Sequence, residues 1–259
     1  MAHKIAVANQ KGGVGKTTTS INLASAIALT GRRTLLVDLD PQAHASLGLG
    51  FDKKEIAQSV YDAMVAEKVL PGMLLNGKVP NLDLLPANIA LAGSEIELVN
   101  MTDRELRLRR TLASVEAGYR YVLIDCPPSL GLLTLNALTA VDSVLIPVQC
   151  EYYAIEGLSR LLETINLVRQ TLNPNLEIEG VVLTMYSSRL NLAQQVVGEV
   201  KNYFGEKVFA TLIPRNVRLA EAPSFGKSLF QFEPSSLAAF AYRALSDEIL
   251  RREPAATPS

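Results

Sequence analysis

Eight consecutive residues, Lys-Gly-Gly-Val-Gly-Lys-Thr-Thr at positions 11–18, have the composition of a phosphate-binding loop. Glycines allow backbone N–H groups to approach phosphate oxygens without Cβ clashes, and a helix that starts at the loop adds its positive end. The ammonium group of Lys16 is placed to reach β- and γ-phosphates, and the Thr17 hydroxyl to bind Mg²⁺. A flexible turn would explain the glycines but not Gly-Lys-Thr at a helix start. We predict nucleotide binding by Gly12, Gly13, Val14, Gly15, Lys16, Thr17 and Thr18.

This loop departs from the usual phosphate-loop pattern at its first position. The pattern places a glycine five residues before Gly15, where this chain has Gln10. The loop has an additional lysine instead, Lys11, at the wrong end of the loop for the ordinary phosphate contact. A cation at that position could reach a nucleotide held by a facing subunit.

Acidic residues follow two apolar segments. Asp38 and Asp40 end the run 35–37, and Asp125 ends the run 121–124. Ligands of open α/β sheets bind at the carboxyl ends of strands, and hydrolysis of a γ-phosphate requires an oriented water molecule. We predict that Asp40 orients this water, that Asp125 binds Mg²⁺ through water, and that Asp38 supports Mg²⁺ through water or supports the loop. Capping of the following helix is the alternative role for each acid.

The rest of the chain alternates between apolar runs and helical patterns. The runs are continuous rather than alternating, which favours strands covered on both faces. We therefore predict an α/β fold, a single domain with a mostly parallel, twisted β-sheet flanked by helices, over residues 1–252, and a disordered tail over 253–259. The predicted strands are 4–9, 34–39, 82–85, 121–124, 143–148, 180–185 and 207–213, and the predicted helices are 17–30, 95–116, 154–172, 191–204 and 235–250.

Composition narrows the classes of function. The chain has 259 residues, 48% of them hydrophobic, and a formal charge of -1, so any nucleic-acid binding must come from a local patch. No apolar stretch of about 18 residues lacks a charge, so no membrane helix is expected. The two cysteines, Cys126 and Cys150, form no disulfide framework, which favours a cytoplasmic protein.

The form of the loop resembles the deviant Walker A motif of the ParA/MinD family of P-loop ATPases. The resemblance extends over about residues 4–250 and is closest to the chromosomal ParA, or Soj, type. It implies ATP or ADP with Mg²⁺ as ligands and an ATP-sandwiched homodimer, in which Lys11 reaches the partner's phosphates and Gly12 lies near the symmetry axis. The segment around Asp40 is similar to the Walker A′ motif, and the segment that begins at Asp125 is similar to the Walker B motif.

The same resemblance implies roles for residues near the ends of two later segments. In the family, Pro214 would pack on adenine, Asn216 would add polar recognition, and Met185 would lie on the opposite side of the ring; taken alone, Pro214 is only a strand terminator. Arg189 and Arg218 match positions that bind double-stranded DNA without sequence preference, although both could be ordinary solvated side chains. A solvated helix face is the interpretation for Arg104, Arg107, Arg109 and Arg110.

The function implied by the resemblance is chromosome or plasmid partitioning on the nucleoid. ATP hydrolysis would be slow and stimulated by a ParB-like centromere-binding protein, and it would release the dimer from DNA. One alternative is a related ATPase that positions another cargo. A MinD-like membrane protein is a second alternative, but residues 247–259 do not form the basic amphipathic helix that it requires. A third is an iron–sulfur protein that uses Cys126 and Cys150, for which buried thiols are the more ordinary state.

Overall fold

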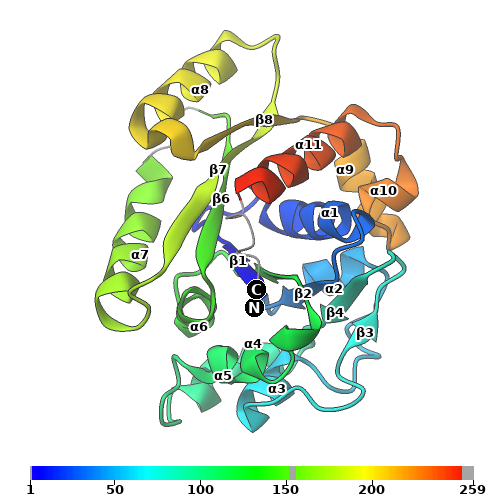
Figure 1. Ribbon diagram of the computed structural model, residues 1–259, viewed down its shortest axis with the longest axis vertical. Helices are drawn as coiled ribbons and strands as arrows, with labels where there is room; N and C mark the ends of the chain where they lie inside the picture. Colours follow the sequence, from blue (N-terminus) through cyan, green and yellow to red (C-terminus); the bar gives the residue numbers. More distant parts are fainter. Residues whose placement is uncertain (1, 152–155, 253–259) are drawn as a thin grey trace, which may run out of the picture.

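The computed structural model of the protein describes residues 2–151 and 156–252. Their eight strands form one sheet in the order β3-β4-β2-β5-β1-β6-β7-β8 (Figure 1). All neighbouring strands run parallel except β3, which is antiparallel to β4. This confirms the predicted mostly parallel α/β sheet. The strands are β1 His3–Val7, β2 Thr34–Asp38, β3 Leu75–Asn76, β4 Leu82–Leu85, β5 Tyr121–Asp125, β6 Ser143–Gln149, β7 Glu177–Tyr186 and β8 Val208–Pro214.

Helices cover both faces of the sheet. The helices α1 and α11 pack together on one face, whereas α5, α6, α7 and α8 lie on the other (Figure 1). The α-helices are α1 Lys16–Leu29, α2 His44–Gly48, α3 Val60–Ala66, α4 Leu91–Leu98, α5 Arg107–Ala113, α6 Leu132–Ala140, α7 Ser159–Thr171, α8 Asn191–Phe204, α9 Arg218–Glu221, α10 Leu229–Phe232 and α11 Leu237–Arg252. The described residues also form four short 3-10 helices, η1 Glu116–Gly118, η2 Glu156–Leu158, η3 Gly205–Lys207 and η4 Ala222–Phe225.

Alternate residues of the central strand β1 pack into different cores. Ile5 and Val7 belong to the core beneath α1 and α11, whereas Ala6 belongs to the core on the other face. Both cores are apolar, so a strand between them needs hydrophobic residues at every position. This is why the strands appear in the sequence as continuous apolar runs, as predicted.

The predicted helix over 95–116 is wrong in its extent. The chain forms α4 and α5 separately, and Asp103 between them has a φ of 53°, a left-handed conformation that ends a right-handed helix. Asn136 of α6 fixes this break, because its side chain donates to the Arg104 carbonyl at 2.8 Å and accepts from the Leu108 N–H at 3.1 Å. The break therefore depends on a contact that lies far away in the sequence.

The other predicted boundaries of helices and strands differ by a few residues from those in the structure, or lie partly outside the described residues. The helix predicted over 154–172 corresponds to η2 and α7, and residues 154 and 155 lie outside the described residues. The predicted tail 253–259 also lies outside them, so the boundary at residue 252 stays a prediction. Within 2–151 and 156–252, no helix has the length and apolar character needed to cross a bilayer.

Candidate nucleotide site

The glycine-rich loop joins the carboxyl end of β1 to the first turn of α1, as the sequence predicts. The strand β1 lies between β5 and β6, so the loop emerges near the middle of the sheet. Two side chains bind the backbone of the loop through hydrogen bonds. Asn9 donates to the Pro147 carbonyl of β6 at 2.7 Å and accepts from the Lys11 N–H at 3.0 Å. Thr184 of β7 donates from its hydroxyl to the Val14 carbonyl at 2.8 Å.

Lys16 lies inside this loop. Its side chain is buried, and its Nζ donates to the Lys11 carbonyl at 3.1 Å, so it bridges the two ends of the loop. Burial lowers the pKa of Lys16, while the nearby Asp125, Cys126 and Asp40 act in the opposite direction. A phosphate would supply the missing negative charge to this ammonium group.

Asp125 is fully buried at the end of β5 and faces the start of α1. Its Oδ1 accepts from the Ser20 hydroxyl at 2.8 Å, and the Thr17 side chain lies close enough to lower the pKa of the carboxyl group. Burial, followed by repulsion from Asp38, raises the pKa of Asp125 to about 8. Among the described residues, its Oδ2 has no hydrogen-bond partner. A buried carboxylate oxygen without a donor, beside a threonine hydroxyl, fits the ligand preference of Mg²⁺.

Asp38 occupies the neighbouring strand end and holds α2. Its Oδ2 accepts from both the N–H and the hydroxyl of Ser46, each at 2.7 Å, and the Ser46 hydroxyl oxygen accepts from the Ala87 N–H at 3.1 Å. Burial raises the pKa of Asp38 to about 6. Asp40 is also buried, and its Oδ1 accepts from the Gln42 N–H at 2.9 Å. Asp38 therefore anchors the segment that carries Asp40.

The residues predicted to contact the adenine base lie at or just after the ends of two adjacent strands. Tyr186 of β7 is paired with Pro214 of β8, and the Arg215 N–H donates to the Tyr186 carbonyl at 3.0 Å. Met185 precedes this pair and has a φ of 53°, uncommon for a residue other than glycine. The Asn216 side-chain oxygen accepts from the Arg218 N–H at 2.9 Å, so it starts the short helix α9. The structure thus brings Met185 and Pro214 together at one edge.

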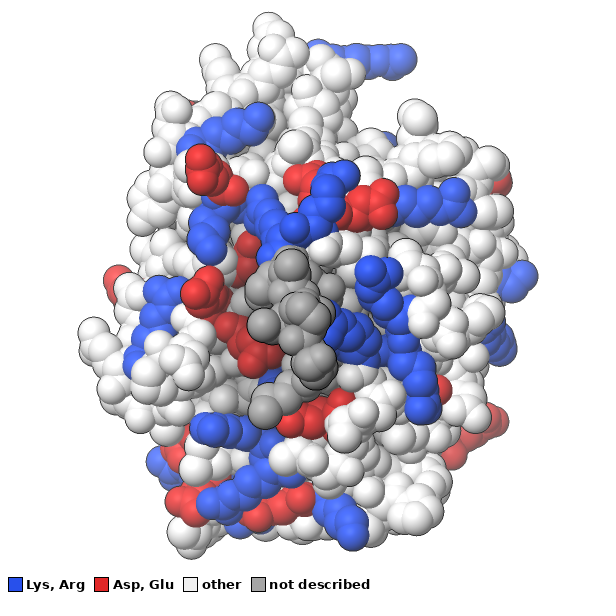
Figure 2. All heavy atoms as spheres, viewed as in Figure 1, with Lys and Arg blue, Asp and Glu red and all other residues white. Residues whose placement is uncertain are grey.

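The predicted dimer and DNA residues are on the surface. Lys11 is exposed, and its Nζ lies 3.4 Å from Glu151. Arg189 is exposed after β7, and Arg218 pairs with Glu221 at 2.7 Å. Figure 2 shows positive and negative side chains interspersed over the face viewed. Any DNA affinity must therefore come from local arginines rather than from the overall charge.

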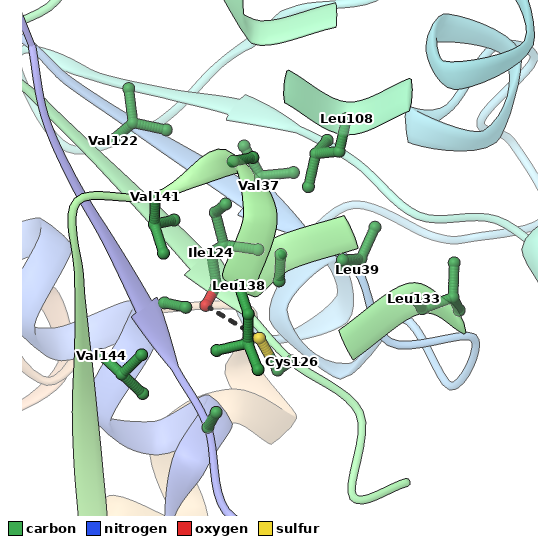
Figure 3. Close-up of a cluster of buried hydrophobic side chains, with 14 of the residues drawn as sticks. Val37, Leu39, Leu108, Val122, Ile124, Cys126, Leu133, Leu138, Val141 and Val144 are labelled. Carbon is green, nitrogen blue, oxygen red and sulfur yellow. Dashed lines mark hydrogen bonds between the residues drawn. The ribbon is translucent and has the colours of Figure 1, made fainter. Parts of the chain in front are cut away.

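The cysteines are buried rather than arranged for a cluster. Cys126 is fully buried among Val37, Leu39 and Leu138, and its Sγ contacts the Ile124 carbonyl at 3.8 Å (Figure 3). Burial raises the pKa of both thiols, that of Cys150 to about 11. Their surroundings are those of structural cysteines.

Four polar side chains around the loop were not predicted from the sequence. They are buried and hydrogen-bond to the loop or to the two acids: Asn9, Ser20, Ser46 and Thr184. Ser20 and Thr184 could have been found from the same feature of the sequence. Each is a hydroxyl residue within an otherwise apolar segment, Ser20 in a predicted helix and Thr184 in a predicted strand. Such a hydroxyl needs an internal partner, which the sequence alone does not identify.

Comparisons with known proteins agree on one family. A family model described as an AAA domain matches residues 2–178. The chain is 56% identical to the sporulation initiation inhibitor protein Soj of Bacillus subtilis, over 96% of this chain and 98% of that protein. It is 52% identical to the chromosome partitioning protein ParA of Myxococcus xanthus, over 98% and 90%. A crystal structure of cobyrinic acid a,c-diamide synthase from Mycobacterium smegmatis, with an ATP analog and magnesium, matches with a TM-score of 0.85 and 40% identity, over 97% of this chain and 95% of that one.

Proposed function

The chain belongs to the AAA-domain family and, within it, to the ParA-type ATPases, and on this premise we propose that it partitions chromosomal or plasmid DNA. The observation that carries the proposal is the buried arrangement of Lys16 and Asp125 beside the loop, because burial disfavours the charged form of Lys16 and Oδ2 of Asp125 has no hydrogen-bond partner among the described residues. The partitioning relatives are more similar in sequence, at 56% and 52%, than the diamide synthase, at 40%. This difference favours partitioning over synthase chemistry.

The loop would bind ATP or ADP through the backbone of residues 12–18 and through Lys16. Thr17 and Asp125 would hold Mg²⁺, which neutralises charge that develops on the phosphates, with Asp38 keeping the neighbouring segment in place. Asp40 would orient a water molecule toward the γ-phosphorus. The new bond forms between this water oxygen and phosphorus, the bond to the β–γ bridging oxygen breaks, and ADP and phosphate leave. Met185, Pro214 and Asn216 would hold the base.

ATP would also assemble two chains. In this assembly, Lys11 leaves Glu151 and contacts the phosphates of the partner, and Gly12 lies near the two-fold axis. The Lys11–Glu151 pair is a weak tether, since both side chains are nearly half exposed and such pairs contribute little. Exchanging it for a phosphate in a closed interface is therefore favourable.

Dimerisation would switch DNA affinity. Arg189 follows β7 and Arg218 follows β8, and these strands are neighbours in the sheet, so both arginines belong to one edge of the molecule. Each phosphate contact adds affinity that is independent of sequence and sensitive to salt. A dimer doubles the number of these arginines, so DNA binding would follow the nucleotide state.

The cycle would end through a second protein. A ParB-like protein bound to a centromere-like site would stimulate an otherwise slow hydrolysis and release the dimer from DNA in the cytoplasm, where the nucleoid lies. A ParA-like ATPase that positions another cargo shares this chemistry and stays an alternative, as does a MinD-like role in placing the division site. Binding to liposomes would favour the MinD-like role over the nucleoid.

The decisive experiment is binding of the purified protein to random-sequence duplex DNA at moderate salt, with ATP and with ADP. We expect retention with ATP and little retention with ADP. Absence of retention in both states, with ATP binding intact, would reject the nucleoid function and leave the nucleotide site unaffected.

A further inference from the structure

Thr184 lies on β7, 170 residues from the loop that it contacts. It is 2% exposed, and its hydroxyl donates to the Val14 carbonyl at 2.8 Å. Its own carbonyl accepts from the Cys150 N–H at 3.1 Å, and it is paired with Gln149 of β6, so its backbone is fixed within the sheet. A rigid strand therefore presents one hydroxyl group to the centre of the glycine-rich loop.

The contact determines the direction of a peptide group. The Val14–Gly15 peptide is trans, and in a planar trans peptide the C=O and N–H bonds point in opposite directions. Because Thr184 holds the Val14 carbonyl, the Gly15 N–H points away from Thr184. The next peptide is fixed as well, since the Gly15 carbonyl accepts from the Thr19 N–H at 2.9 Å in the first turn of α1.

These two fixed peptides explain the conformation of Gly15. Its φ of 90° and ψ of 25° lie in the left-handed region, which residues other than glycine rarely adopt. The methyl group of Thr184 lies under the same residue, 3.8 Å from the position that a Cβ of Gly15 would occupy. Thr184 thus presents two groups to the loop, a hydroxyl that bonds to Val14 and a methyl group on the side of Gly15 where a Cβ would lie.

We propose that Thr184 is a positioning residue of the nucleotide site, whose hydroxyl orients the Gly15 N–H as a donor to a phosphate oxygen. The inference rests on the proposed nucleotide site. Without the hydroxyl, the Val14 carbonyl loses its buried partner and the peptide is free to rotate, which removes a donor from the phosphate cradle. The neighbouring residue Met185 is predicted to contact the base, so the same strand end would position both ends of the nucleotide.

Two substitutions separate the effect of the Thr184 hydroxyl from that of its methyl group. Thr184→Val keeps the shape and the methyl group but removes the hydroxyl, whereas Thr184→Ser keeps the hydroxyl and removes the methyl group. Thr139→Val is the matched control, because the Thr139 residue is equally buried but its hydroxyl bonds, in the described part of the chain, only to the Leu135 carbonyl within α6, at 2.7 Å. The wild type and the three variants would be titrated with ADP and with AMP in the presence of Mg²⁺ by calorimetry.

We expect Thr184→Val to weaken ADP binding about tenfold, equivalent to about 1.4 kcal/mol, and to lower the ratio of ADP to AMP affinity. Thr184→Ser and Thr139→Val should bind ADP within about threefold of the wild type, less than the effect of one lost hydrogen bond. Unchanged ADP affinity in Thr184→Val would overturn the inference, and so would equal losses in the Val and Ser variants. Wild-type protein that fails to bind ADP would instead overturn the nucleotide site itself.

If Thr184→Val does not fold, the wild type provides the test. A crystal structure with ADP should keep the Thr184 hydroxyl within hydrogen-bond distance of the Val14 carbonyl and place a phosphate oxygen at the Gly15 N–H. A rotated Val14–Gly15 peptide in that complex would overturn the inference.

Discussion

Asp38 and Asp125 are direct neighbours in register across β2 and β5, and both carboxyl groups are fully buried. Asp38 disfavours the ionisation of Asp125, which adds to the effect of burial in raising the pKa of Asp125, whereas burial and, to a smaller extent, Asp40 raise the pKa of Asp38. Ser46 satisfies one oxygen of Asp38 with two hydrogen bonds, whereas Asp125 keeps Oδ2 without a partner in the described part of the chain. The two acids therefore differ in their surroundings: Asp38 is bonded to the start of α2, whereas one oxygen of Asp125 is left for the Mg²⁺ that we propose.

Asp125→Asn should weaken Mg²⁺ binding in the presence of ADP by at least about tenfold, because the amide keeps the shape but removes the charge. The same change should raise the free energy of unfolding of the nucleotide-free protein by about 1 kcal/mol, since a buried acid next to Asp38 is removed. Magnesium titration and urea unfolding measure the two effects. Unchanged Mg²⁺ affinity would contradict the assignment.

Lys16→Ala should lower kcat/KM for ATP by about 100-fold or more, equivalent to about 2.7 kcal/mol, because the buried ammonium group lies within the loop that we propose to bind the phosphates. Steady-state phosphate release measures the effect. Lys201→Ala, which alters an exposed lysine in the last turn of α8, is the control and should leave turnover unchanged. Normal turnover in Lys16→Ala would reject the phosphate role.

Asp40→Ala should bind ATP yet accumulate as a dimer, because loss of water orientation blocks hydrolysis without removing the phosphate contacts. Light scattering after gel filtration with ATP would give the mass. The exposed Asp247 of α11 provides the control, Asp247→Ala, which should cycle normally. A monomeric Asp40→Ala protein with bound ATP would show that Asp40 has a different role.

Arg189→Ala and Arg218→Ala should weaken binding to duplex DNA while ATP-driven dimerisation stays intact. Each lost phosphate contact should reduce the slope of log affinity against log salt by about 0.9, so each substitution should reduce it by about 1.8 in a dimer. Arg109→Ala, at an exposed arginine of α5, is the control. If DNA retention and its salt dependence do not change, both arginines are ordinary solvated side chains.

Glu179→Gln tests how the free energy of unfolding depends on pH through a carboxyl group near the amino ends of the strands. Burial alone would raise the pKa of Glu179, but hydrogen bonds from His3 at 3.0 Å and Ser143 at 2.6 Å lower it overall. An acid with a lowered folded-state pKa stabilises the protein above its ordinary pKa and loses this effect as pH falls through the folded value. Glu179→Gln should therefore lower the free energy of unfolding by about 1–3 kcal/mol at pH 7.

This difference should shrink as the pH falls below the ordinary pKa of a glutamate, about 4.3, and through the lowered pKa of Glu179. Urea unfolding between pH 7 and pH 3 measures it, with the exposed Glu163→Gln on α7 as the control. A difference that is constant across this range would exclude ionisation of Glu179 as the cause.

Several parts of this protein could be predicted from local patterns in its sequence. The loop at 11–18, the strand ends at Asp38 and Asp125, and the parallel sheet all follow from glycine spacing and continuous apolar runs, which are properties of neighbouring residues. The adjacency of the two acids was not contained in those patterns. It follows from the strand order, in which β5 lies between β2 and β1.

Contacts between residues far apart in the chain could not be predicted in this way, because they depend on how the elements pack. Thr184 reaches Val14 only because β7 lies two strands from β1, and Asn136 divides the predicted helix 95–116 only because α6 packs on α5. A buried hydroxyl or amide must find an internal partner, but which partner it finds depends on the packing of the whole sheet and its helices. That packing is a sum over many non-local apolar contacts, so it has no local signature in the sequence.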